Sequence, residues 1–182
     1  MKFPTVENAA LVMIDMQQKL LPAMSDPQAV LERNLQLLNA ADALKLDLLV
    51  TEQYPKGLGN TVPELATWIG EKTPVIAKTS FSVFGSPEFC AELDKRKREV
   101  LIFCGIESHV CLLQSVLDAV ERGFEVIVVS DAVMSRKFSD CHAALEMMRS
   151  KGITVMSTES VLFMLLRDAA HPAFKTISKL VK

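Results

Sequence analysis

The sequence predicts a three-layer α/β sandwich, in which a six-stranded parallel sheet of order 3-2-1-4-5-6 has helices on both faces. Three observations lead to this prediction. Six short apolar runs alternate with longer segments whose apolar residues recur every three or four positions. The runs are apolar throughout, as strands covered on both faces should be, rather than alternating with polar residues. Repeated strand–helix units of this kind favour parallel strands joined by right-handed crossovers.

The expected strands are spaced along most of the chain. They cover residues 9–15, 47–52, 74–78, 100–106, 124–130 and 153–157. Between the first two, residues 26–45 predict a helix with Asp26 as its N-cap and Pro27 in its first turn. Two later helices each end in a basic residue followed by a glycine, Gly123 and Gly152, which is a usual stop signal. No GxGxxG follows the first strand, so the usual dinucleotide fingerprint is absent.

The chain is expected to form a single domain over residues 1–182, because its length suits one hydrophobic core and no Pro-, Gly- or Ser-rich linker divides it. Its last segment, 167–182, predicts a tail helix. The apolar face of this helix contains Phe174, Ile177, Leu180 and Val181. That face can pack either on its own domain or on a neighbouring chain, and the sequence leaves both open.

Composition and charge exclude several classes of function. The 20 basic and 22 acidic residues give a net charge of −2, and the one basic cluster, 94–99, is most simply a solvated helix end. We therefore expect no nucleic-acid partner. No apolar run approaches the ~20 residues of a membrane span, and the N-terminus has no signal-peptide pattern, so we expect no membrane partner. Four cysteines without a secretory signal indicate reduced thiols in a cytoplasmic protein. Their spacing shows no zinc-ligand pattern.

Reactive side chains stand where the expected strands end. Asp15 closes the first strand, Glu52 the second and Lys78 the third, while the turn after the fourth leads to Cys111. Ligands of open parallel sheets bind at this edge. Asp15 and Lys78 both follow apolar residues, so each should have a partner of opposite charge or a hydrogen-bonding partner. The alternatives to a functional role for these two residues are a structural ion pair or strand ends that reach solvent.

Cys111 occupies an unusual position for a structural cysteine, because it lies just past a polar turn at the start of a helix. A helix N-terminus and a nearby ammonium both stabilise a thiolate, so we expect its pKa to lie below the ordinary ~8.5. A carboxylate within reach can take the thiol proton and later return it to a leaving group. The alternative is a small apolar filler, the commoner fate of free cysteines.

Together, the stretches AALVMIDMQ, PVIAKTSFSVF and IFCGIESHVCLLQSVLDA resemble the isochorismatase-like cysteine hydrolase superfamily, and TEQYPKGLGNTVPEL resembles its isochorismatase-domain-containing branch. The resemblance runs from about residue 9 to residue 166. It implies that Cys111 is the nucleophile, Asp15 the general acid/base and Lys78 the residue that orients the pair. It also implies a cis peptide between Ile106 and Glu107. That bond would direct the backbone N–H groups of Glu107 and Cys111 at a developing oxyanion.

Two departures from the superfamily narrow the expected chemistry. Where nicotinamidases have metal-binding aspartate and histidine residues, this chain has Glu52 and Tyr54, so we expect neither a metal nor a cofactor. Dedicated isochorismatases break a vinyl ether without the cysteine. Retention of Cys111 therefore favours hydrolysis of a small amide-like substrate through a thioester, with isochorismatase-type hydrolysis of another bond as the alternative.

Several neighbours receive weaker assignments. Gln17 is expected to hydrogen-bond around the site, close to the substrate. Phe81 and Phe84 either line an apolar pocket or cover the core, and Tyr54 either adds specificity to that pocket or belongs to a loop. His109 is expected to be a turn residue rather than the partner of a Cys–His dyad.

Two other classes of function compete with the hydrolase. One is an oligomeric interaction protein that has lost efficient turnover, against which the intact set of Asp15, Lys78 and Cys111 argues. The other is a redox-sensing thiol, which would need a resolving cysteine, and Cys104 is expected to be buried in a strand. The resemblance implies a homo-oligomer, a dimer or larger, acting on a small molecule.

Overall fold

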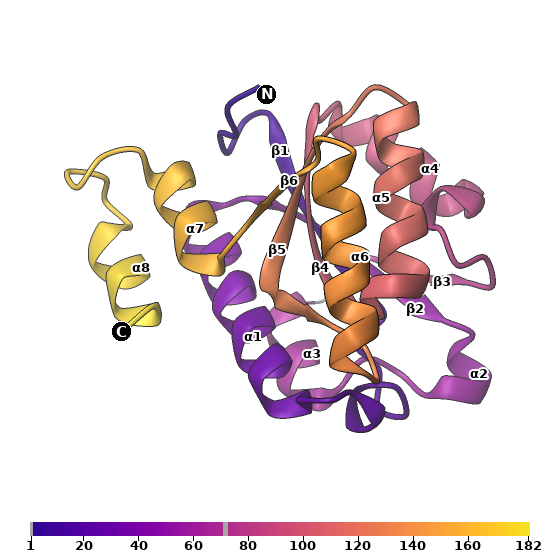
Figure 1. Cartoon of the computed structure of the whole chain (residues 1–182). Coiled ribbons are helices and arrows are strands. Elements are labelled where there is room, and N and C mark those ends of the chain that lie inside the picture. The colour runs from indigo at the N-terminus through magenta and orange to yellow at the C-terminus, as the bar shows by residue number, and fades with distance from the viewer. Residues whose placement is uncertain (1, 71–72) are drawn as a thin grey trace.

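The computed structural model describes residues 2–70 and 73–182, and its centre is a six-stranded parallel sheet (Figure 1). The strand order is β3-β2-β1-β4-β5-β6, so the predicted fold class and order are confirmed. The strands are β1 (Ala9–Ile14), β2 (Asp47–Gln53), β3 (Val75–Lys78), β4 (Val100–Ile106), β5 (Glu125–Met134) and β6 (Thr154–Met156). β1 lies beside both β2 and β4, so the strand order reverses at the centre of the sheet.

Helices cover both faces of the sheet, as Figure 1 shows. On one face lie α1 (Pro27–Leu44), α3 (Pro63–Ile69), α7 (Thr158–Leu166) and α8 (Phe174–Leu180). On the other lie α4 (Pro87–Arg96), α5 (Leu113–Glu121) and α6 (Phe138–Ser150). The short helix α2 (Pro55–Leu58) follows β2, and single turns occur at Leu21–Ala23, Val83–Gly85 and Ser108–Leu112.

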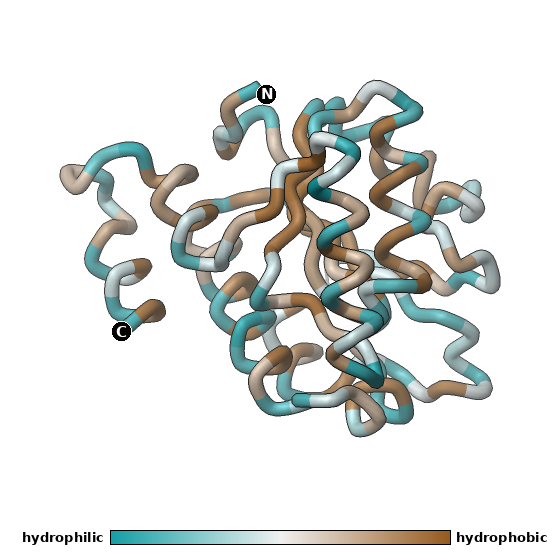
Figure 2. The backbone as a smooth tube through the Cα atoms, viewed as in Figure 1, coloured by the Kyte–Doolittle hydropathy of each residue, from teal (hydrophilic) through white to brown (hydrophobic). Residues whose placement is uncertain are grey.

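The position of β1 between two hydrophobic cores explains why its sequence is apolar at every position. All six of its residues are buried. Leu11 and Met13 point into the core beneath α1 and α7, while Val12 and Ile14 point into the core beneath α4, α5 and α6. A strand with a core on each side needs an apolar residue at every position. The hydropathy view shows the same arrangement, with hydrophobic strands inside and hydrophilic helix faces outside (Figure 2).

Two elements differ from their predicted bounds by more than one residue. β5 continues to Met134, four residues beyond the predicted end, because a register shift near Gly105 lets β5 keep pairing with the end of β4. The tail helix covers Phe174–Leu180 rather than 167–182, and the chain before it forms turns. Ile177 is fully buried against α1 and α7, so the apolar face of the tail packs on its own chain.

The predicted start of the first long helix is confirmed. The Asp26 carboxylate accepts a hydrogen bond of 3.0 Å from the Ala29 N–H, and Pro27 is the first helical residue. Within residues 2–70 and 73–182, no helix is long and apolar enough to cross a membrane.

Candidate active site

The carboxyl ends of three strands bring Asp15, Lys78 and Cys111 together. Asp15 directly follows β1, Lys78 is the last residue of β3, and Cys111 lies in the π-helical turn Ser108–Leu112 after β4. Lys78 Nζ donates to Asp15 Oδ2 at 2.7 Å, and both side chains are fully buried. Both groups interact with the Cys111 thiol. The lysine thus reaches across β2 to a site beyond β1 and β4, two strands away from its own.

Gly105 allows β4 to end where the cysteine turn must begin. Its φ of 102° lies in a region that other residues avoid, and a Cβ at this position would lie only 2.1 Å from the Ile14 carbonyl oxygen. Only glycine lets the two backbones approach so closely. β4 continues through Gly105 to Ile106, and the turn Ser108–Leu112 that carries Cys111 follows directly.

The Asp15 carboxylate is fully enclosed and fully paired. Its Oδ1 accepts from the Thr51 hydroxyl at 2.7 Å, its Oδ2 accepts from Lys78, and its backbone N–H donates to the Thr51 carbonyl at 3.1 Å. Its φ is 51°, a left-handed conformation that few residues other than glycine adopt. Backbone strain of this kind persists where surrounding contacts enforce it, and it is common at functional sites.

The Lys78 ammonium is held by oxygen atoms from three segments. Besides Asp15, it donates to Gln53 Oε1 at 2.7 Å, to the Phe81 carbonyl at 3.1 Å and to the Ser80 carbonyl at 3.3 Å. These four acceptors replace the water that a buried ammonium loses. Its position beside the thiol and carboxylate is therefore fixed by the structure rather than by the length of its side chain alone.

Thr51 and Gln53 were missed by the sequence reasoning, which singled out Glu52 between them. Alternate residues of a strand share a face, so Thr51 and Gln53 both point toward the charged pair. Glu52 points to the other face, where it accepts hydrogen bonds from the Thr61 N–H and hydroxyl at 2.6 and 2.8 Å. In the sequence TEQ, Thr51 and Gln53 are two residues apart, and this strand spacing is the signal that could have identified them.

The Cys111 thiol is 6% exposed, and its acidity differs from the expectation. Burial and the neighbouring Asp15 carboxylate raise the pKa of Cys111 to about 12, and the opposing effect of Lys78 is smaller. The expected pKa below ~8.5 is therefore wrong for the free protein, because that reasoning counted the lysine and the helix terminus but not burial. The resting side chain is a neutral thiol beside a carboxylate that can accept its proton.

The peptide bond between Ile106 and Glu107 is cis, as the resemblance implied. The Glu107 side chain lies beside the next loop, where its Oε2 accepts from Arg136 Nε at 2.9 Å. The Glu107 carbonyl accepts from the Val110 and Leu112 N–H groups at 3.1 and 3.2 Å, which closes the turn around Cys111. The turn that carries the thiol is thus fastened on both sides.

Gln17 and Phe84 lie near the site but are engaged in packing. The Gln17 amide joins the ends of β1 and β2 to the following loop, because it donates to the Gln53 and Gly59 carbonyls at 3.0 and 2.6 Å and accepts from the Gln53 N–H at 2.7 Å. Phe84 is buried against Phe89, with ring centroids 5.6 Å apart. These placements favour supporting roles over direct contact with a substrate.

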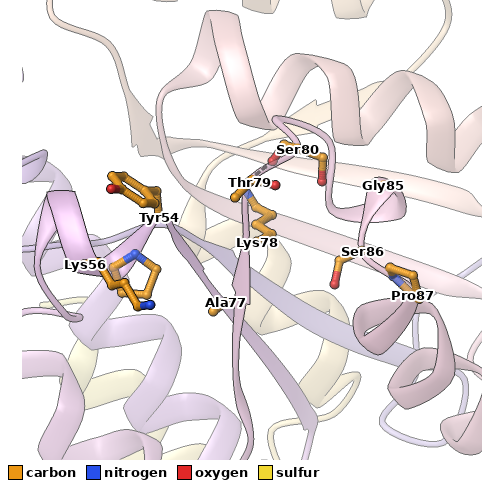
Figure 3. Close-up of a pocket in the computed structure, with 10 residues that line it drawn as sticks. Tyr54, Lys56, Ala77, Lys78, Thr79, Ser80, Gly85, Ser86 and Pro87 are labelled. Atoms are coloured by element: carbon orange, nitrogen blue, oxygen red, sulfur yellow. Dashed lines mark hydrogen bonds between the residues drawn. The ribbon is translucent and has the colours of Figure 1, made fainter.

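A pocket of about 440 Å³ lies along the free edge of β3, next to the charged pair (Figure 3). Its walls are Tyr54, Pro55, Lys56, Ala77, Lys78, Thr79, Ser80, Gly85, Ser86 and Pro87. Lys78 borders the pocket, although its side chain is fully buried, whereas Asp15 and Cys111 do not line the pocket. Tyr54 is 54% exposed at its rim, and Phe81 is 52% exposed in the loop that follows Lys78.

His109 is not positioned as a general base for Cys111, because both of its ring nitrogens lie close to other partners. Its Nδ1 lies 2.9 Å from the Ser135 hydroxyl, and its Nε2 lies 4.0 Å from Asp140 Oδ2. Both ring nitrogens are therefore directed at the loop and helix after β5, which agrees with the expected turn role.

The described part of the chain contains no group of three His, Cys, Asp or Glu side chains arranged to hold a metal ion. All four cysteines, Cys90, Cys104, Cys111 and Cys141, are free thiols. The chemistry available at the carboxyl edge of the sheet is thus that of a thiol, a carboxylate and an ammonium in one buried cluster.

Comparison with known proteins identifies similar chains. The family model of the isochorismatase domain matches residues 9–160. Isochorismatase domain-containing protein 2A of Mus musculus is 38% identical over 177 residues, which are 97% of this chain and 84% of that protein. A solved structure described as MAR1 ribonuclease from Caenorhabditis elegans has a TM-score of 0.93 and 38% identity, covering 99% of this chain and 92% of the other. The YcaC protein of Escherichia coli, described as an octameric hydrolase of unknown specificity, has a TM-score of 0.92 and 26% identity, covering 99% and 89%.

Proposed function

The chain belongs to the isochorismatase family of hydrolases, and from that premise we propose that it is a cysteine-dependent hydrolase of small amide-like molecules. Cys111 is the nucleophile, Asp15 the general acid/base and Lys78 the group that holds Asp15 and stabilises negative charge on sulfur. The observation that carries this proposal is the buried cluster of the three side chains, with the Lys78–Asp15 contact at 2.7 Å. A cluster of a nucleophile, a base and an orienting group is the pattern that nucleophilic catalysis requires.

The first half-reaction forms a thioester. Asp15 accepts the Cys111 proton as sulfur attacks the substrate carbonyl carbon, and the carbonyl oxygen becomes an oxyanion. The backbone N–H groups of Glu107 and Cys111 stabilise this oxyanion, a contribution worth ~10²–10³ in rate per donor in other enzymes. Asp15 then returns the proton to the leaving nitrogen as the C–N bond breaks.

The second half-reaction regenerates the protein. Water attacks the thioester carbonyl and gives up a proton to Asp15, the carboxylic acid product leaves, and the Cys111 sulfur recovers its proton. The neutral thiol suits this sequence, because the raised pKa of Cys111 makes proton transfer to Asp15 part of the attack rather than a separate step before it. Lys78 offsets the cost of placing negative charge on a buried sulfur.

We propose that the substrate enters from the pocket beside β3, because Lys78 and the loop that follows it border this pocket. The Lys78 side chain itself is fully buried. Tyr54 lies at the rim of the pocket and Phe81 in the adjoining loop, so we propose that both contact the substrate, while Gln17 and Phe84 support the surrounding backbone. We also propose that the protein is a homo-oligomer, which is supported by the octameric E. coli relative.

The test compares wild type with Cys111→Ala on a panel of small amides and esters. We expect turnover of at least one compound, a mass increase equal to the acyl group on the wild-type chain after rapid quenching, and neither signal in the variant. Cys90→Ala is the matched control, because Cys90 is half-buried on α4 and should leave activity unchanged. Undiminished turnover in Cys111→Ala would overturn the proposal.

A second candidate function is ribonuclease activity, favoured by the description of the C. elegans relative. The charge distribution of this chain gives it less support. The basic residues Lys95, Arg96, Lys97 and Arg98 precede β4, at the opposite edge of the sheet from Cys111, and Arg98 is paired with Asp47 at 2.7 Å. Incubation of the same preparations with single-stranded RNA separates the two candidates, because cleavage that persists in Cys111→Ala would favour a site other than the cluster described above.

A further inference from the structure

We propose that Ser115 and Asp118 form a clamp that holds the loop after Lys78 against helix α5, which directly follows the turn carrying Cys111, so that both are positioning residues for catalysis. We define the α5 clamp as Ser115 and Asp118 with their partners Val83 and Ser82. The proposal rests on the proposed function, since it concerns the geometry of the same nucleophile and lysine. Neither clamp residue is assigned a role in the steps above.

The first contact of the clamp passes through the Ser115 hydroxyl. It donates to the Cys111 carbonyl at 2.6 Å and accepts from the Val83 N–H at 3.0 Å. Ser115 is fully buried, so both hydrogen bonds are made away from water and losing either leaves a buried polar group unpaired. A single hydroxyl therefore joins the Cys111 backbone to the backbone of Val83, which lies 32 residues from Ser115 in the sequence.

The second contact lies one turn further along α5. The Ser82 hydroxyl donates to Asp118 Oδ2 at 2.5 Å, a short bond to a charged acceptor, and the same hydroxyl accepts from the Phe84 N–H at 3.2 Å. Ser115 and Asp118 are three residues apart and so lie on one face of the helix. Two adjacent residues of the loop, Ser82 and Val83, are thus fixed to two adjacent turns of α5.

The clamped loop is the segment that holds the lysine. Lys78 Nζ donates to the carbonyls of Ser80 and Phe81, which immediately precede Ser82. Ser80 is also tied to this segment, because its hydroxyl donates to the Ser82 carbonyl at 2.9 Å. Hydrogen bonds joined by the backbone of residues 80–83 therefore connect the Cys111 carbonyl to the ammonium, in addition to the direct pairing of Lys78 with Asp15.

The clamp has a chemical consequence because the effect of Lys78 on the Cys111 thiol depends on the distance between the ammonium and the sulfur. Lys78 lowers the pKa of Cys111 against the larger effects of burial and Asp15. Electrostatic interactions fall with separation, so a loop that moves Lys78 away from sulfur raises the pKa of Cys111 further. The same displacement weakens stabilisation of the negative charge on sulfur, and slows both alkylation and acylation.

The experiment measures the rate of Cys111 alkylation by iodoacetamide from pH 7 to 10, together with kcat and KM, in Ser115→Ala and Asp118→Asn. We expect alkylation at pH 9 to slow by about threefold in each variant, because a rise of one pKa unit gives tenfold less thiolate, offset about threefold by higher intrinsic nucleophilicity. The value of kcat should fall by a similar factor while KM changes less than about twofold, because the clamp acts on the reacting groups. Asp118 is only half-buried, so we expect Asp118→Asn to fold even where Ser115→Ala does not. Asp118→Asn then still tests the effect of the clamp on alkylation and kcat.

A matched control distinguishes positioning from general stability. Thr158 is buried on α7, across the sheet, where its hydroxyl donates to Asp131 at 2.8 Å. Thr158→Val should lower the melting temperature without changing the pH profile of alkylation. Ser115→Thr, which keeps the hydroxyl, should restore the profile. Unchanged alkylation and kcat in a folded Ser115→Ala or Asp118→Asn protein would overturn the clamp, whatever the change in melting temperature.

A further variant separates failure of the clamp from failure of the proposed function. Lys78→Met removes the lysine charge and should slow alkylation of Cys111 and abolish turnover. Slow reaction in Lys78→Met with a normal profile in Ser115→Ala would reject the clamp alone. Normal alkylation and turnover in Lys78→Met would reject the role of the lysine, and with it both the catalytic assignment and the clamp.

Discussion

Replacing Asp15 with asparagine should make Cys111 react faster with a simple alkylating reagent while abolishing turnover. Asparagine keeps the shape of the side chain, and its one carbonyl oxygen can accept from Lys78 while its NH2 group donates to the Thr51 hydroxyl, but it removes the negative charge that raises the pKa of Cys111. With a pKa of about 12, only about 10⁻⁴ of Cys111 is thiolate at pH 8. Each unit by which the pKa falls gives tenfold more thiolate, offset about threefold by lower intrinsic nucleophilicity.

The net expectation is about threefold faster alkylation per unit of pKa lost. The assay follows the intact mass of the Asp15→Asn protein with iodoacetamide from pH 7 to 10, with Cys111→Ala to identify the modified site. Turnover should disappear in the same preparation, because no group remains to take the thiol proton and deliver it to the leaving nitrogen. Alkylation that is unchanged or slower than in wild type, in a folded protein, would refute the reasoning that Asp15 holds the sulfur as a thiol.

Two further predictions concern stability. Burial raises the pKa of Cys104, so the folded state favours the neutral thiol. The contribution of this thiol to the free energy of unfolding is complete below the unfolded pKa near ~8.5. It is lost, at up to about 1.4 kcal/mol per pH unit, as the pH rises from there toward the folded pKa. Urea unfolding at pH 8 and 10 should therefore show a smaller decline for Cys104→Ala than for wild type, and an equal decline would contradict it. Gly105→Ala should cost about 3 kcal/mol or more, since its Cβ would meet the Ile14 carbonyl, whereas Gly152→Ala, with a φ of 75° and no atom within 4 Å, should cost about 1–2 kcal/mol. Equal costs at the two glycines would show that close packing at Gly105 does not restrict the residue there.

The fold was predictable because its signals are local. Uninterrupted apolar runs indicate strands with a core on each face, and Asp26 with Pro27 marks a helix start. The bounds that failed depend on contacts between distant segments. β5 extends to Met134 because the register of β4 shifts near Gly105, and nothing in the residues of β5 alone signals that extension. The tail helix begins late, at Phe174, although its apolar spacing suits a longer helix.

The reactive side chains of the candidate site could be predicted from the sequence, but the residues that hold them in place could not. The strand ends and the family resemblance indicated Asp15, Lys78 and Cys111, and the structure brings these three together. The residues that hold them, Thr51 and Ser115, look like ordinary hydroxyl residues in the sequence. Their roles come from partners 36 and 32 residues away, which no local pattern encodes.

The error in the expected acidity of Cys111 follows from the same distinction. A helix start and a lysine are visible in a sequence and both favour a thiolate, whereas the depth of burial depends on the finished packing. In this protein burial and Asp15 outweigh Lys78, so the sulfur rests as a thiol. A thiol nearly without charge at neutral pH resists indiscriminate alkylation and oxidation, because both reactions proceed through the thiolate. In the proposed mechanism, this arrangement couples activation to the substrate: the sulfur becomes nucleophilic when Asp15 takes its proton and a carbonyl carbon receives the electron pair. The same coupling argues against the redox-sensor alternative, which requires an accessible, low-pKa thiol at rest.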